Sequence, residues 1–117
     1  IGMNKENSQM LIDDAILCFT LGEELKAKDI LLEVLQVEPE NLNALRAIAE
    51  VFLSLEDLKS SESYCRRALS IDPEDLTTTV SLARILVKQG DKEGAENATS
   101  KARILGWKEE LASDGDD

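Results

Sequence analysis

The chain has 117 residues, enough for one domain with a modest core but not for two. Its 24 acidic and 13 basic residues give a net charge of −11, which repels nucleic-acid phosphates and anionic lipid headgroups and disfavours both as partners. No apolar run approaches the roughly 20 residues that cross a bilayer, and the first residues lack the apolar core of a signal peptide. The sequence therefore predicts an acidic, soluble, cytoplasmic protein without membrane insertion.

Apolar residues recur at three-and-four spacing in six stretches, which form three pairs with a period of 34 residues. After an N-terminal tail over residues 1–7, whose first two residues we expect to stem from processing or from an added segment, each pair is predicted to form an antiparallel helical hairpin. Acidic turns around Pro39 and Pro73 close the first two pairs. Residues 110–117 are predicted to be an acidic, disordered tail. The three pairs cover residues 8–41, 42–75 and 76–109.

The first helix of each pair carries alanine at the same place, in Ala15, Ala49 and Ala83, where a small side chain lets two helices approach closely. Neighbouring columns are apolar in all three copies and are predicted to face the core. These two columns are Leu17, Val51 and Ile85, and Cys18, Phe52 and Leu86.

The turns between helices recur as well. Gly22 and Gly90 end first helices, where a left-handed residue is commonly needed. Four acidic or amide residues are placed to cap the helices that follow. These are Asn41, Asp57, Asp75 and Asp91.

These features resemble the tetratricopeptide repeat, a family whose repeats combine small residues in both helices, a glycine turn and a closing proline. The first copy matches through Ala15, Gly22, Ala27 and Pro39. The second copy has Glu56 in place of the turn glycine, and the third ends in Trp107 where the others have proline. The resemblance covers about 102 residues of the chain. It implies an all-α, right-handed superhelix (an α-solenoid) of three antiparallel helical hairpins.

The two ends of such an array must face water and are expected to lose apolar residues on their outer sides. In the third repeat Thr99 and Arg103 replace apolar residues of the earlier second helices, which predicts a polar closing face. Asp14 is predicted to face outward at the start of the array. Trp107 is expected to fold back over the last hairpin.

In the family, the first helices line a concave groove that holds an extended or helical segment of a partner protein. Carried over by position, the resemblance places four residues of each repeat in this groove, of which we predict three in each repeat to bind the partner. They are Ile12, Ile16 and Phe19, then Arg46, Glu50 and Leu53, then Val80, Arg84 and Val87.

Two of these assignments have structural alternatives. Ile12, Ile16 and Phe19 share one helical stripe, so they form either an exposed contact surface or ordinary core, because a one-residue error in phase exchanges the two. Arg46 and Arg84 either grip an acidic partner or form an internal ladder with Glu50, which lies four residues after Arg46 and one repeat before Arg84.

The clamp with which some family members hold acidic chaperone C-termini needs lysine, asparagine and arginine in the groove. Here the matching places hold residues that cannot pair with a carboxylate in that way, so a chaperone-tail adaptor of this type is not expected. These residues are Ile12, Ile16, Ala47, Thr77 and Ser81.

Little in the sequence suits catalysis or a cofactor. There is no histidine, no glycine-rich phosphate loop and no nucleophile beside a base, and two cysteines in helical apolar patterns suggest buried thiols, not a metal site. Adjacent carboxylates such as Asp13 and Asp14 splay apart on a helix. We therefore expect a non-catalytic protein-interaction module without metal or cofactor. The alternatives are a self-assembly module that forms a homo-oligomer and a targeting domain cut from a larger protein or enzyme.

Overall fold

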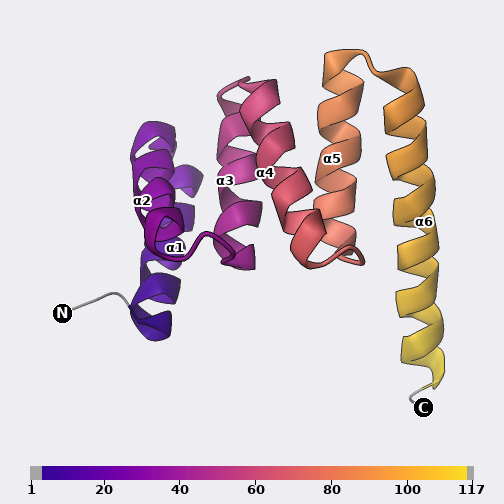
Figure 1. Cartoon of the computed structure of the whole chain (residues 1–117), viewed down its shortest axis with the longest axis horizontal. Helices are drawn as coiled ribbons and strands as arrows, with labels where there is room; N and C mark the ends of the chain where they lie inside the picture. The colour runs from indigo at the N-terminus through magenta and orange to yellow at the C-terminus, as the bar shows by residue number, and fades with distance from the viewer. Residues whose placement is uncertain (1–3, 116–117) are drawn as a thin grey trace.

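In the computed structural model, which describes residues 4–115, the chain is a row of antiparallel α-helices, with no strand in that range (Figure 1). The first helices of the three hairpins are α1, α3 and α5, and the second helices are α2, α4 and α6. Their bounds are α1 Lys5–Thr20, α2 Glu24–Val37, α3 Leu42–Ser54, α4 Leu58–Ile71, α5 Leu76–Gln89 and α6 Lys92–Gly115. The predicted all-α solenoid of three hairpins is confirmed.

Each hairpin contacts only its neighbours. Every helix packs against the next one along the chain, and the first helices also touch each other, α1 against α3 and α3 against α5. Within residues 4–115, no helix of the first hairpin contacts the third. Hydrogen bonds between residues 34 apart connect adjacent repeats. They join Asn43 to Gln9, Arg84 to Glu50 and Lys108 to Glu74.

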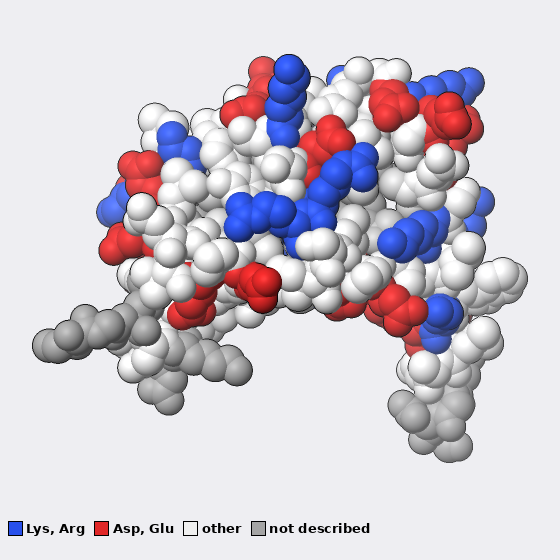
Figure 2. Space-filling model, in the orientation of Figure 1, with Lys and Arg blue, Asp and Glu red and all other residues white. Residues whose placement is uncertain are grey.

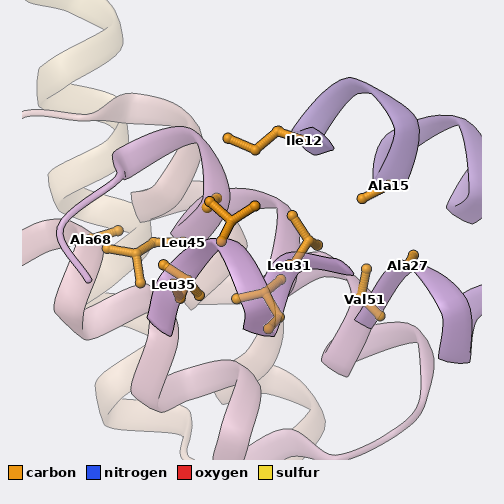
Figure 3. Packing of buried hydrophobic residues seen from close by; sticks show 11 residues of the cluster. Ile12, Ala15, Ala27, Leu31, Leu35, Leu45, Val51 and Ala68 are labelled. Carbon is orange, nitrogen blue, oxygen red and sulfur yellow. The ribbon is translucent and has the colours of Figure 1, made fainter. Parts of the chain in front are cut away.

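The core consists of two clusters, one at each junction between hairpins. The first lies between the first and second hairpins, where Ile12, Leu31, Leu45 and Ile48 are buried (Figure 3). The second lies between the second and third hairpins. Its buried members are Ala49, Leu53, Cys65, Leu82, Ile85, Leu86, Ala95 and Ala98.

The predicted core columns hold with one exception. Ala15 and Ala49 are buried and Ala83 is half-buried, and Val51 and Ile85 are buried as expected. Leu17, in the same column as Val51 and Ile85, is instead 57% exposed. The prediction for Leu17 is wrong because α2 and α4 cover the α3 and α5 positions, whereas no helix precedes α1 in the described chain.

All three turns within hairpins use the same backbone hydrogen bonds. In the first, the Gly22 amide donates to the Phe19 carbonyl and the Glu23 amide to the Cys18 carbonyl, and the other two turns repeat this pattern. Gly22 and Gly90 adopt positive φ as predicted, at 87° and 78°. Glu56 adopts a φ of 63° at the equivalent place, a conformation that strains a residue with a Cβ.

Replacing Glu56 with glycine is expected to raise the free energy of unfolding by about 0.5 to 1 kcal/mol, because relief of the strain exceeds the entropy that glycine gains in the unfolded chain. The matched change, Gly90→Ala, should lower it by about 1 kcal/mol, since no atom lies within 4 Å of an added Cβ and only backbone strain acts there. Chemical denaturation of both variants checks the pair. If both variants changed the free energy of unfolding in the same direction, the argument from backbone strain would be contradicted.

Three of the four predicted caps form. The side chains of Asn41, Asp57 and Asp91 accept hydrogen bonds from the backbone amides of Ala44, Ser60 and Gly94. Asp75 caps no amide with its side chain, so that prediction is wrong. Its carboxylate instead accepts from the Thr78 hydroxyl and pairs with Arg46.

The helices at both ends are longer than expected. α1 begins at Lys5, inside the predicted N-terminal tail, and α6 continues to Gly115. The prediction of a disordered tail is therefore wrong for residues 110–115, because residues 108–112 are strong helix formers and an ion pair from Lys108 to Glu74 ties the helix just before this segment to the turn between α4 and α5. Residues 116–117 of that tail, and residues 1–3, lie outside the described range. Trp107 is 67% exposed and does not cover the last hairpin.

Candidate partner-binding surface

The three first helices meet around a cleft of about 340 Å³. α1 contributes Phe19, α3 contributes Glu50 and Leu53, and α5 contributes Arg84. These four predicted residues are thus brought together by the structure. The remaining lining residues are Ser54, Glu56 and Lys88.

An ion pair between repeats crosses this cleft. Nη1 of Arg84 lies 3.3 Å from Oε1 of Glu50, and the Ser81 hydroxyl donates to the same oxygen at 2.6 Å. Glu50 is half-buried, and Arg84 and Ser81 together hold its carboxylate in place. One half of the predicted Arg46–Glu50–Arg84 ladder is therefore present.

The other half is absent because Arg46 turns to a different carboxylate. Its Nε lies 2.8 Å from Oδ2 of Asp75, the residue before α5. That Nε is buried and its N–H is not aligned with an acceptor, so the contact is an ion pair without a linear hydrogen bond. Arg46 thus connects α3 to the start of α5 and has little freedom to grip a partner.

Two charged side chains at the cleft are unpaired. Neither Lys88 nor Glu56 lies within ion-pair distance of an opposite charge in the part of the chain that is described, and both are exposed. No partner-binding role was predicted for Lys88, Ser54 or Glu56. For Lys88 a signal existed, since it follows Arg84 by four residues and therefore lies on the same side of α5.

The predicted apolar stripe of α1 divides between the core and the surface. Ile16 is 46% exposed, whereas Ile12 is fully buried in the first core cluster and Phe19 is half-buried against it. The expectation that Ile12 is exposed in the groove is wrong, because it faces the junction with the second hairpin. Leu53, at 6% exposure, belongs to the second core cluster and reaches the cleft only with its edge.

The two apolar predictions on α5 are exposed but lie in different places. Val80 is 42% exposed and does not line the cleft at Phe19. Val87 is 66% exposed and lines a separate hollow of about 540 Å³ between α5 and α6. The nine predicted residues thus do not form one continuous surface.

Charge is unevenly distributed over the molecule despite its net −11. Figure 2 shows Lys and Arg side chains gathered over α4, with acidic side chains on either side. α4 carries Lys59, Arg66 and Arg67. Arg66 is paired with Glu62, and Arg67 donates to the Pro39 carbonyl and lies over the Tyr64 ring, so most of this positive charge has an internal role.

The structure offers no grouping suited to metal chemistry among the described residues, where no cluster of three His, Cys, Asp or Glu side chains is found. Asp13 and Asp14 are both exposed, as expected for adjacent carboxylates on a helix. Cys18 and Cys65 are free thiols. Within residues 4–115, no helix is long and apolar enough to span a membrane.

Stacked antiparallel hairpins whose first helices line one inner surface are typical of helical-repeat proteins. Residues 43–75 match the model of the tetratricopeptide repeat, and about nine tenths of the chain superposes on solved domains of this kind. Residues 43–75 are thus a tetratricopeptide repeat, and the fold around them is that of tetratricopeptide repeat domains, as the resemblance implied.

Three solved structures illustrate the similarity. The first tetratricopeptide domain of Spaghetti (RPAP3), bound to the HSP90 peptide SRMEEVD, is 16% identical, with a TM-score of 0.84 over 90% of this chain and 83% of that one. PcrH from Pseudomonas aeruginosa is 16% identical, with a TM-score of 0.84 over 89% and 79%. The tetratricopeptide domain of Arabidopsis OM64 is 18% identical, with a TM-score of 0.83 over 88% and 85%. No curated protein matches the sequence.

Proposed function

We propose that this chain is a non-catalytic, cytoplasmic protein-interaction module that binds a segment of another protein across its first helices. The fold is that of a protein-interaction scaffold, and similar domains have been solved with partner peptides. The observation that carries the proposal is the cleft at Phe19, Leu53 and Arg84, because all three first helices contribute to it. A segment lying there would touch every repeat at once.

The chemistry of the cleft favours an amphipathic segment with an acidic residue. The half-buried ring of Phe19 offers apolar contact on α1, and Ile16, three residues earlier and outside the cleft lining, adds exposed apolar area that is available for burial. Lys88 offers an unpaired ammonium group, and Arg84 keeps donors beyond those that point at Glu50. We assign partner contact to Ile16, Phe19, Arg84 and Lys88, with Val80 beyond the cleft.

The HSP90 peptide SRMEEVD, to which RPAP3 is bound in the solved structures, does not fit this surface. The positions that would hold a carboxylate clamp carry Ile12, which is buried, and Ile16, Ala47, Thr77 and Ser81. Ser81 already donates its hydroxyl to Glu50. We therefore expect no binding of the peptide SRMEEVD, and a different partner.

Affinity capture from a native lysate tests the proposal. A variant with Ile16→Glu and Lys88→Glu should lose the bound partner, because it places charge in the apolar contact and reverses the free ammonium group, while both positions are exposed enough to leave the fold intact. The matched control changes Leu25 and Lys59 to glutamate, an exposed apolar residue and an exposed lysine that line neither this cleft nor its rim. Circular dichroism verifies folding of both. Equal capture by the two variants would rule out this surface.

A further inference from the structure

The two ends of the solenoid carry complementary surfaces. At one end, Met10 and Leu17 on α1 are 65% and 57% exposed, although the equivalent residues of α3 and α5 are buried against the preceding hairpin. Those equivalents are Ala44 and Val51 in the second repeat and Thr78 and Ile85 in the third, none more than 2% exposed. We call Met10, Asp14 and Leu17 the head face. It has the position and largely apolar character of a stacking surface, and no helix within residues 4–115 is stacked on it.

At the other end, the hollow of about 540 Å³ between α5 and α6 is where a following first helix would lie. The positions equivalent to its lining are covered by α3 in the first hairpin and by α5 in the second. In the second hairpin these are Leu53, Ser61, Cys65 and Leu69, all buried or half-buried. In the third they are Val87, Ala95, Thr99 and Arg103, which we call the tail cleft. Thr99 and Arg103 are exposed, as predicted for a closing face.

One charged residue on each surface identifies the occupant. Asp14 stands where the inner junctions have Ile48 and Leu82, and Arg103 stands where they have Leu35 and Leu69. Leu69 and Leu82 line the same hollow, and Leu35 and Ile48 belong to the same core cluster. Stacking one copy on another in the geometry of the inner junctions therefore brings Asp14 of one beside Arg103 of the other. An apolar contact within the chain becomes an ion pair between chains.

We propose that α1 of a second copy of this chain occupies the tail cleft, so that copies stack head to tail. The cleft is lined by Lys92 and Arg103 against a single acid, Glu96, and is therefore locally positive in a strongly negative chain. Asp14 on the head face supplies the opposite sign. Because the head and the tail are different surfaces, the contact is heterologous and can extend into a ring or a filament.

The association is expected to be weak. A single helix seated between two others forms an interface near the lower limit of specific contacts, about 1,000 Å² in total. The net charge of −11 on each copy also opposes association at low ionic strength. Sedimentation velocity of the purified chain at about 0.15 M salt, over roughly 5 to 500 μM, should show a mass that rises with concentration.

Charge reversal tests the direction of the contact. Asp14→Arg and Arg103→Asp should each weaken self-association about tenfold, because each places like charges together. An equimolar mixture of the two variants, and the double variant, should associate like the original chain. The matched controls are Asp29→Arg and Lys101→Asp, at columns exposed in every repeat, and they should have no effect.

Other results would overturn the proposal. A monomer at every concentration removes it. Association lost in Leu17→Glu but unchanged in Arg103→Asp would mean that two head faces pair with each other. Association that survives both changes would place the contact elsewhere, for example at the Phe19 cleft.

Discussion

Replacing Ile12 with alanine is expected to lower the free energy of unfolding by about 3 kcal/mol, while the same change at Ile16 should cost less than about 1 kcal/mol. Ile12 is fully buried among Leu45, Ile48 and other members of the first core cluster, so its truncation leaves a cavity between two hairpins. Ile16, one turn further along α1, is 46% exposed and loses little contact. Chemical denaturation of the two variants measures the difference.

Each of the two variants serves as the control for the other, since both changes remove the same atoms from the same helix. They therefore have the same effect on intrinsic helix propensity. Similar losses at both positions would mean that α1 is rotated relative to the structure. Such a rotation would also return Ile12 to the partner-binding surface.

Cys65 is expected to react with a chromogenic aryl disulfide at least about a thousandfold more slowly in the folded chain than in the unfolded one. The thiol is fully buried in the second core cluster. Burial, helped by the charge of Glu50, raises the pKa of the Cys65 thiol to about 12, so almost no reactive thiolate exists near neutral pH. Reaction then requires opening of the junction between the second and third hairpins.

A Cys18→Ser variant isolates this reaction, and the same variant in denaturant supplies the reference rate. A folded-state rate within tenfold of that reference would contradict the burial of Cys65. The raised pKa also sets a direction with pH, because the folded state holds the proton more tightly than the unfolded chain. This contribution to stability is full below the ordinary thiol pKa of 9.0 and is lost as the pH rises toward 12.

The repeat period made the architecture predictable. A column of residues 34 apart reports the same environment three times, so the small residues at Ala15 and Ala49 and the turns at Gly22 and Gly90 could be read directly. The period even located the strained turn, since Glu56 stands where the other copies have glycine and takes the same left-handed conformation. The period predicts burial wrongly where the neighbouring helices differ between repeats, which is why Leu17 is exposed although Val51 is buried.

The site was less predictable because it depends on side-chain choices among several partners. Arg46 had two possible ion-pair partners, Glu50 one turn away on its own helix and Asp75 directly before α5. Local spacing alone favoured Glu50, whereas the structure pairs Arg46 with Asp75. The length of α6 was missed for a different reason. No proline follows Leu105, α6 continues through Gly106, and acidic composition was mistaken for disorder.

The separation of the core into two clusters has a mechanical consequence. The clusters have no buried residue in common, although Tyr64 packs against both, and the first and third hairpins do not touch within the described range. The two junctions can therefore flex largely independently of each other. The distance between the first and third hairpins then depends on two small rotations, one at each junction, and changing this distance requires little free energy. A segment that touched all three first helices would stiffen both junctions at once, and its binding would narrow the range of curvatures that the unbound molecule samples.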